Sequence, residues 1–307
     1  MWDVHCETVP VAFGFFFMIN LVHLRSFLAI VDAKGVRAAA RELELAPSTV
    51  VEHIRQLEND LSVPLLVRAH PVTEATREGE RLLPYARALV RTASQLGELI
   101  RTPSLRLSAS SNVGTYMLQQ PLAAFFQRTG IDADLWIGPN PDVAARLERG
   151  EADIAVMEWW DGRKGFRATT WKQEPLVVIV APGHPWADRS VVEPDDLACE
   201  TLLGGESGSG TGRILREQLG SVADRFRTRT GWGSTEAVKR AVKAGFGISI
   251  VMSSSVADEV AAGQLVALPV SGVSFVKEIK VVLPETQLQS SAAVEFLNVC
   301  CRDLEDA

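Results

Sequence analysis

Cysteine is scarce in this chain of 307 residues, which has four: Cys6, Cys199, Cys300 and Cys301. Their spacing matches neither a metal site nor a disulfide framework, and the adjacent pair at 300 and 301 suits a normal disulfide poorly. We therefore expect reduced thiols and no bound metal ion. A cysteine pair that senses peroxide is the alternative that this pattern leaves open.

An excess of positive charge is also absent. The chain has 31 Lys and Arg against 38 Asp and Glu, a formal net charge of −7. Contact with a nucleic acid would therefore have to come from a local surface. Hydrophobic residues make up 47% and charged residues 22%, which excludes a disordered, collagen-like or disulfide-stapled chain. The length suits about two domains of roughly 150 residues each.

The sequence lacks a hydrophobic run long enough to cross a bilayer. Residues 9–19 form an apolar run of eleven residues, whereas a membrane helix needs about 20. Asp3 and Glu7 precede this run where a signal peptide carries Lys or Arg, and no small-residue cleavage site follows it. We expect no export, no membrane anchor and a cytoplasmic location. Met18 opens a more natural chain, so residues 1–17 are expected to be a disordered extension.

Catalytic constellations are missing as well. The sequence shows no carboxylate pair, no cluster of His, Cys and Asp ligands, and no Gly-x-Ser-x-Gly elbow. His184 lies between Gly183 and Pro185, which favours a histidine in a turn over a general base. These absences predict that the protein is not an enzyme and needs no cofactor.

Three short helices are predicted near the start of the chain. Asn20 can cap the first helix, and Gly35 separates it from the second. Pro47 suits the first position of the third, because its missing N–H costs nothing there. Each helix has one apolar face at three- and four-residue spacing, formed by Leu21, Leu24, Leu28 and Val31, by Val36, Ala39, Ala40 and Leu43, and by Val50, Ile54, Leu57 and Leu61.

The third helix has a polar face opposite its apolar one, with Ser48, Thr49, Glu52, His53, Arg55 and Gln56. Two short helices joined by a tight turn predict a helix-turn-helix, whose last helix offers such side chains to a DNA major groove. A small helical bundle without a role in DNA binding is the alternative.

A longer helix is predicted after Thr76, which can cap it, and runs toward Thr102. Apolar residues recur along it at alternating spacings of four and three, the a/d pattern of a coiled coil: Leu82, Ala86, Leu89, Ala93, Leu96 and Ile100. We expect this helix to pair two copies of the chain. A single amphipathic helix packed on its own domain is the alternative.

The remaining two thirds of the chain alternate between short strands and helices. Strands are predicted at 105–109, 134–137, 153–157 and 176–181, and helices at 113–128, 143–149, 214–219 and 236–244. Repeated strand–helix units imply parallel sheets with helices on both faces. Ligands bind such sheets beyond the carboxyl ends of the strands, beside helix N-termini.

Three loops rich in Gly and Ser precede helices in this part of the chain, at residues 110–112, 204–212 and 231–235. Hydroxyl groups and free backbone N–H groups at such places accept anions. The second loop is not a Walker loop, because no Lys follows its glycines, and it lacks the spacing of a dinucleotide site. A plain turn is the alternative for each loop, and three such loops together favour binding.

The N-terminal quarter resembles the LysR-type transcriptional regulator family. The resemblance rests on the alanine-rich stretch at 38–45, Pro-Ser-Thr-Val at 47–50, Ile-Arg-Gln-Leu-Glu at 54–58 and Pro-Leu-Leu-x-Arg at 64–68. It implies a winged helix-turn-helix at residues 18–77 and a linker helix that pairs subunits at 78–102. The chain departs from the family at Ala46 and Pro47, where Ser and Gln are usual.

The resemblance implies that the third helix contacts bases and that Arg68 lies in the wing or contacts a DNA phosphate. Ser48, Thr49 and His53 are the strongest candidates for base or phosphate contact. The full set of candidate DNA-binding residues is Arg37, Pro47, Ser48, Thr49, Glu52, His53, Arg55 and Arg68.

Residues 105–285 resemble the family's effector domain, which is similar to periplasmic-binding-protein folds. The resemblance implies an α+β multidomain protein with an effector domain at residues 103–307. Subdomain I of this domain spans about 103–180 and 271–307, and subdomain II spans about 181–270. Residues 181–185 match the crossing between the two subdomains. The Ser-Gly-Ser-Gly-Thr stretch at 207–211 resembles the subgroup that controls sulfur and carbon-fixation genes.

The same resemblance places an effector between the two subdomains. The candidate effector-binding residues are Ser110, Ser111, Asn112, Asn140, Glu158, Glu206, Ser207, Ser209, Thr211 and Trp232. Hydroxyl groups and helix-start N–H groups suit an oxyanion such as sulfate, sulfite or phosphonate, or a carboxylate. Trp159, Trp160 and Trp232 could enclose a tail, with Glu158 or Glu206 meeting an amine; packing in the core is the alternative for the tryptophans.

The implied partners are a double-stranded DNA operator, a small effector and a second copy of the chain, in a homodimer and further a homotetramer. RNA polymerase is a further partner implied by the family. A soluble protein that binds or hydrolyses a small anion, without DNA specificity, is the alternative from another class.

Overall fold

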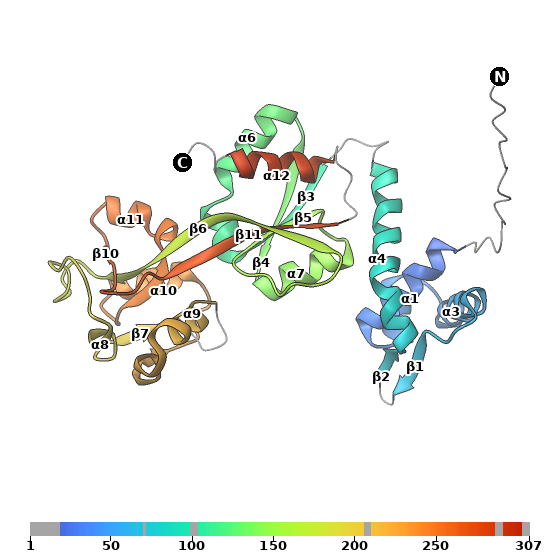
Figure 1. The fold of residues 1–307 in the computed structure, drawn as a ribbon, viewed down its shortest axis with the longest axis horizontal. Coiled ribbons are helices and arrows are strands. Elements are labelled where there is room, and N and C mark those ends of the chain that lie inside the picture. The colour runs from blue at the N-terminus through green and yellow to red at the C-terminus, as the bar shows by residue number, and fades with distance from the viewer. Residues whose placement is uncertain (1–18, 70–71, 99–103, 206–209, 286–290, 303–307) are drawn as a thin grey trace, which may run out of the picture. The chain divides into compact units, whose positions relative to one another are not determined.

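The computed structural model describes residues 19–69, 72–98, 104–205, 210–285 and 291–302 (Figure 1). Its contacts divide the chain into two units, Met1–Gly97 and Glu98–Ala307. The predictions for residues 1–17, Ile100, Glu206, Ser207 and Ser209 fall outside the described residues. Among the residues that are described, no helix combines the length and the apolar character that crossing a membrane requires.

The first unit is a winged helix-turn-helix followed by a long helix. Its elements are α1 (Leu21–Ala33), α2 (Val36–Glu42), α3 (Pro47–Leu61), β1 (Leu66–Ala69), β2 (Val72–Ala75) and α4 (Arg77–Glu98). Strands β1 and β2 form an antiparallel hairpin in which Leu66 pairs with Ala75. The predicted starts of the first three helices are confirmed, as is the start of the long helix after Thr76. Helix α2 ends at Glu42, one residue before Leu43, and the predicted continuation of the long helix beyond Glu98 toward Thr102 lies outside the described residues.

Local chemistry explains where these helices begin and end. The Asn20 side chain accepts a hydrogen bond from the backbone N–H of Val22 at 2.8 Å, and Thr76 accepts one from Gly79 at 3.0 Å. Pro47 is the first residue of α3. The apolar faces meet in one core that includes Leu24, Phe27, Ile30, Val50, Ile54, Leu57, Leu65 and Ala86.

The second unit is built on a mixed sheet with the strand order β10-β6-β11-β5-β3-β4, and β9 also pairs with β6. One half of the unit contains β3 (Ser104–Ser110), α5 (Ser111–Tyr116), α6 (Gln119–Thr129), β4 (Asp132–Gly138), α7 (Asn140–Arg149), β5 (Ile154–Met157), β11 (Val276–Pro284) and α12 (Ala292–Arg302). Figure 1 shows α6 and α12 on one face of this sheet and α7 on the other.

The other half of the unit is smaller. It contains α8 (Pro194–Leu197), β7 (Thr201–Leu203), α9 (Gly210–Leu219), the 3₁₀ helix Gly220–Arg225, β8 (Arg227–Arg229), α10 (Thr235–Lys243), β9 (Ser249–Met252), the 3₁₀ helix Ser253–Ser255, α11 (Ala257–Ala261) and β10 (Val266–Leu268). Its helix α10 contributes Val242 to a hydrophobic cluster that also contains Ile179, Leu203 and Leu265.

Two strands join the halves. The 15-residue strand β6 (Phe166–Val180) pairs with β11 from Phe166 to Pro175, and its next residues pair with β9 and β10. Figure 1 shows β6 and β11 side by side across the unit. The crossing predicted at residues 181–185 is therefore wrong, because this segment follows β6 instead of linking the halves. His184 does lie in a turn, where its Nδ1 accepts the Trp186 N–H at 3.2 Å.

Two further predictions for this unit are wrong. The sheet is mixed, because β3 runs parallel to β4 and β5, whereas β11 runs antiparallel to β5 and β6. The helix predicted at 113–128 is two helices, α5 and α6, which break at Met117 and Leu118. Pro121 would remove a hydrogen bond and clash within one continuous helix, whereas the first turn of α6 tolerates it.

Candidate functional site

The start of α3 presents the polar surface that the sequence predicts. Pro47 and Ser48 are exposed, Thr49 is half-buried, and Arg37 of α2 is exposed. Val50, Ile54 and Leu57 lie on the buried face. The apolar stripe therefore anchors α3 in the unit and leaves its first turn free.

Three side chains on α3 bind one another. Glu52 accepts hydrogen bonds from Arg55 at 2.8 Å and from Gln56 at 2.9 Å. These bonds, with that of Arg55 the larger cause, lower the pKa of Glu52 to about 2. Glu52 also offsets the charge of Arg55, which weakens the attraction of Arg55 for a DNA phosphate.

His53 is more enclosed than its predicted role as a base contact requires. Its Nδ1 lies 2.8 Å from the hydroxyl of the buried Ser26, and its ring stacks on His23 of α1 at 4.9 Å between centroids. Burial first, and then the neighbouring His53, lower the pKa of His23. Sequence reasoning missed this pair, because the two histidines are 30 positions apart. Arg68 lies in β1, paired with Thr73 of β2.

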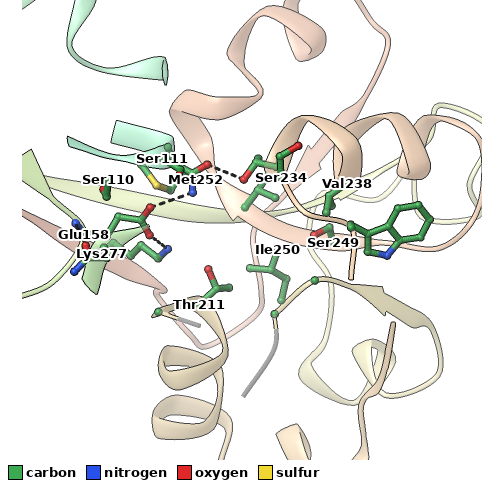
Figure 2. A pocket seen from close by; sticks show the side chains of 18 of the residues that line it. Ser110, Ser111, Glu158, Thr211, Ser234, Val238, Ser249, Ile250, Met252 and Lys277 are labelled. Carbon is green, nitrogen blue, oxygen red and sulfur yellow. Dashed lines mark hydrogen bonds and ion pairs between the residues drawn. The ribbon is translucent and has the colours of Figure 1, made fainter. Parts of the chain in front are cut away.

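The second unit contains a cavity of about 410 Å³ between its two halves (Figure 2). One half contributes Ser110, Ser111, Asn112, Pro139, Asn140, Pro141, Glu158, Trp159 and Lys277. The other contributes Leu203, Gly204, Gly205, Gly210, Thr211, Trp232, Gly233, Ser234, Thr235, Val238, Ser249, Ile250, Val251 and Met252. All three predicted loops therefore meet here, as far as their residues are described.

Ser110 ends β3 at the carboxyl edge of the sheet, where α5 begins. The residue is 2% exposed, and its hydroxyl has no hydrogen-bond partner among the described residues. A buried hydroxyl without a partner costs free energy, so this group in the cavity wall is a candidate for a hydrogen bond to a ligand or to water. The side chains of Ser110, Thr211 and Lys277 all lie along the cavity in Figure 2.

Glu158 and Lys277 form a buried ion pair in the cavity wall. Glu158 follows β5, and Lys277 lies in β11, on the same face as the buried Ile279 and Val281. The prediction that Glu158 meets an amine of the ligand is corrected, because its partner is the chain's own Lys277. Sequence reasoning missed Lys277, although a lysine in register with buried apolar residues of a strand was the signal.

Asn140 has a supporting role. Its amide nitrogen donates to the carbonyl of Trp159 at 3.0 Å, and its oxygen accepts the Glu158 N–H at 3.0 Å. These bonds fix the chain where Glu158 and Trp159 enter the cavity. Trp160 does not line the cavity; its ring packs on Phe166.

Trp232 lines the cavity from the other half, and Phe246 packs edge-on against its ring. The indole N–H of Trp232 is buried and has no hydrogen-bond partner among the described residues. It is therefore a second donor that a ligand could satisfy. Ser234 and Thr235, which begin α10, also line the cavity and were not among the predicted site residues.

Residues 101–304 match the family described as the LysR substrate binding domain, and residues 21–80 match the bacterial regulatory helix-turn-helix proteins of the lysR family. The chain belongs to the LysR family of bacterial transcriptional regulators. As a member of this family it binds DNA operators and small effectors and acts as an oligomer. It is a regulator and not an enzyme, and the alternative of an anion-binding protein or hydrolase without DNA specificity is not favoured.

Several proteins of known sequence are similar to this LysR regulator. CbbR of Sinorhizobium medicae is 32% identical over 82% of this chain and 83% of its own length. PtxE of Stutzerimonas stutzeri is 40% identical over 63% of this chain and 100% of its own. The RuBisCO operon transcriptional regulator of Allochromatium vinosum is 29% identical over 83% of this chain and 86% of its own.

Two solved structures share the fold. Full-length OxyR from Pseudomonas aeruginosa has a TM-score of 0.66 with 19% identity and covers 94% of this chain and 95% of its own. The regulatory domain of CcmR from Synechocystis, solved in complex with 2-PG, has a TM-score of 0.59 with 25% identity. This match covers 66% of this chain and 97% of that domain. The resemblance to regulators of carbon-fixation genes is thus confirmed.

Proposed function

We propose that the effector of this regulator is a small anion that binds at Ser110, Thr211 and Lys277, which we call the anion subsite. The hydroxyl of Ser110 carries the proposal, because it is buried in the cavity wall and has no partner among the described residues. Thr211 lies in the first turn of α9, whose backbone N–H groups have no partner within the helix. Such a turn favours negative charge.

The charged residues that line the cavity favour a ligand with a small net charge. Glu158 and Lys277 are the charged residues among the described lining residues, and they form an ion pair. A bound anion would accept a hydrogen bond from the Lys277 ammonium, which also binds Glu158. Hydroxyl and backbone N–H groups would donate the other hydrogen bonds to the anion. The complex of the CcmR regulatory domain with 2-PG supports a small ligand in this fold.

Titration calorimetry with sulfate, inorganic phosphate, 2-PG and acetate tests the anion subsite. We expect at least one of these anions to bind the full-length protein. Ser110→Ala should weaken that binding by about 1.5–3 kcal/mol, the range for a hydrogen bond to a charged group. Ser254→Ala is the matched control, because its buried hydroxyl also has no partner among the described residues but lies outside the cavity. Equal binding by both variants would exclude Ser110 as a contact.

We infer that the operator is contacted by the first turn of α3, where Ser48 is exposed and Thr49 half-buried. Replacing Ser48 or Thr49 by Ala should weaken specific binding by about 1–3 kcal/mol for each interaction with a base that the substitution removes. Arg68→Ala should weaken binding to all sequences and flatten its salt dependence. Footprinting and salt titrations on the DNA that flanks the gene would measure both effects.

The matched control for these contacts is Asn59→Ala, because Asn59 is exposed near the other end of α3. It should leave the affinity unchanged. If Ser48 and Thr49 can both be replaced without a change in operator preference, the bases are contacted elsewhere. A homodimer, its further assembly to a tetramer and contact with RNA polymerase are proposed from the family resemblance.

A further inference from the structure

Helices α5 and α10 belong to different halves of the second unit and meet at two contacts. In the inner contact, the Thr235 hydroxyl donates to Asn112 Oδ1 at 2.7 Å. In the outer contact, the Lys239 ammonium lies 5.0 Å from the centroid of the Tyr116 ring. Asn112 and Tyr116 are four residues apart on α5, as are Thr235 and Lys239 on α10, so each pair lies on one helix face.

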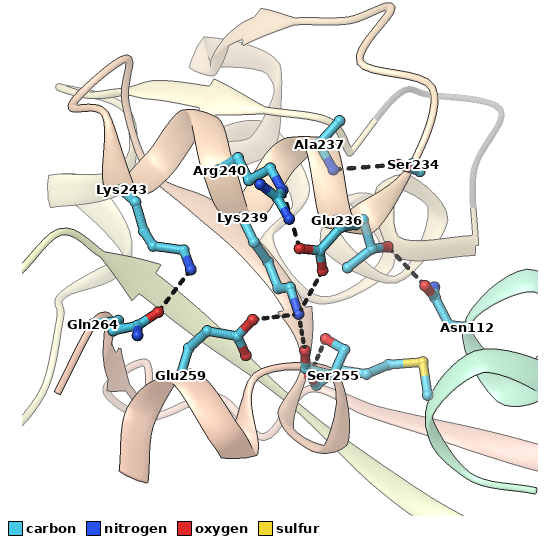
Figure 3. Close-up of polar contacts among 12 residues, drawn as sticks. Asn112, Ser234, Glu236, Ala237, Lys239, Arg240, Lys243, Ser255, Glu259 and Gln264 are labelled. Carbon is cyan, nitrogen blue, oxygen red and sulfur yellow. Dashed lines mark hydrogen bonds and ion pairs between the residues drawn. The ribbon is translucent and has the colours of Figure 1, made fainter. Parts of the chain in front are cut away.

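Lys239 is held rigidly at the outer contact (Figure 3). It is 3% exposed, and its Nζ lies 2.7 Å from Glu259, 2.9 Å from Glu236 and 2.9 Å from the carbonyl of Ser255. An ammonium has three N–H donors, so these three acceptors use all of them. Although burial opposes its charge, bonds to the two carboxylates raise the pKa of Lys239.

The two contacts differ in their relation to the cavity. Asn112 and Thr235 of the inner contact line it, whereas Tyr116 and Lys239 do not. Asn112 also donates to Glu158 at 3.1 Å, and Glu158 binds Lys277. The inner contact is thus joined to the charged pair in the cavity wall, while the outer contact touches none of the lining groups that would bind an anion.

We propose that Tyr116 and Lys239 are positioning residues, which hold α5 against α10 so that the two halves of the cavity meet before a ligand is bound. The assignment rests on the proposed function of the cavity as the effector site. The Lys239 ammonium attracts the electron-rich face of the Tyr116 ring and also interacts with the Tyr116 hydroxyl, while Glu236 and Glu259 hold it in place. The inner contact then aligns Asn112 with Thr235.

Hydrogen exchange of the ligand-free, full-length protein tests this role. Tyr116→Leu removes the aromatic face and should raise amide exchange in α10, across the contact, by about 2- to 30-fold, which corresponds to the range for a cation over a ring. Tyr116→Phe keeps the face but loses the bond between the phenol hydroxyl and Lys239, so it should raise exchange less than Tyr116→Leu does, and α7 should not change in either variant. Faster exchange confined to α5, or equal effects of Leu and Phe, would overturn the proposal.

Thr235→Val is a second variant that keeps the shape of the side chain and removes the inner hydrogen bond. It should raise amide exchange in α5, the partner helix. This variant therefore tests the contact between the two halves even if Tyr116→Leu fails to fold. No change in α5 would show that the helices do not depend on each other, which contradicts the proposal.

Calorimetry with sulfate and 2-PG separates the proposal from the function on which it rests. If wild type binds either anion, Tyr116→Leu should bind it about 2- to 30-fold more weakly, and Tyr116→Phe, which keeps the ring, should lose less affinity than Tyr116→Leu. Equal affinities of wild type and Tyr116→Leu would overturn the positioning role. If wild type binds neither, that result counts against the anion subsite, and the exchange measurements alone decide whether Tyr116 and Lys239 hold the halves together.

Discussion

Glu158 and Lys277 form an ion pair in the wall of the cavity. Their side chains are 12% and 4% exposed, so neither charge is well solvated without the other. Breaking a buried pair costs more than its net contribution, because one charge is left buried and alone. The pair therefore keeps a positive charge in the cavity wall at a low cost in stability.

Lys277→Met should lower the free energy of unfolding by about 3–5 kcal/mol, since it leaves the Glu158 carboxylate unpaired. Adding Glu158→Gln should recover much of that loss. Urea unfolding followed by tryptophan fluorescence would measure both variants. Lys280→Met on the same strand is the control, because the Glu278 partner of Lys280 is exposed and the expected loss is about 1 kcal/mol or less. Equal losses at Lys277 and Lys280 would contradict the buried pair.

The stacked histidines predict that the first unit loses stability in acid. Burial, followed by His53, lowers the pKa of His23 below its ordinary value of 6.5. The folded state therefore binds fewer protons than the unfolded chain near this pH. The stability that His23 contributes is present above pH 6.5 and is lost as the pH falls through the lower folded value.

Hydrogen exchange of α1 and α3 in the full chain, between pH 7.5 and 5, would detect this loss after correction for intrinsic exchange rates. His23→Leu should flatten the pH dependence, and His184→Gln, in the other unit, should not. A pH profile that is the same in wild type and His23→Leu would rule out His23 as the cause.

Among the helices, α4 packs on its own unit along only part of its apolar stripe. Its first half packs on its own unit, where Ala86 is buried and Leu82, Leu83 and Val90 border the core. Along the same apolar stripe Leu89 is 45% exposed and Leu96 is 58% exposed. The stripe thus begins in the core of one chain and continues as an apolar surface that a second copy could cover.

Leu89→Asp should convert the proposed dimer to monomers, because dimer formation would then bury a charge in an apolar interface. Sedimentation equilibrium at micromolar concentration would show the change in mass. Ser94→Asp is the matched control, because Ser94 is exposed but lies outside the apolar stripe. A wild-type protein that is monomeric under these conditions would contradict the role of α4.

The break between helices α5 and α6 has a local cause in the sequence, as the starts of the helices do. Helix α5 ends at Tyr116, and Pro121 lies in the first turn of α6, so the break falls between them. Residues 112 and 116 of α5 both contact α10. No local pattern predicts this contact, because the partners lie 123 positions apart.

For the whole molecule, regulation requires that an effector bind one arrangement of the protein more tightly than another. The two halves of the second unit are joined by β6 and β11 and by the contacts between α5 and α10. A ligand at the anion subsite would contact both halves, since Ser110 and Thr211 belong to different ones. An effector can therefore bind with different affinities to arrangements in which the two halves lie closer together or further apart.

The helix-turn-helix, the order of most elements and the three loops that meet at the cavity could be predicted from local signals. Such signals are the caps Asn20 and Thr76 and the periodic apolar faces. The pairing of Lys277 with Glu158 across 119 positions, and of Asn112 with Thr235 across 123 positions, is visible only in the folded chain. Such contacts depend on the path of β6 and β11, which strand pairing across the whole unit sets and which no local pattern encodes.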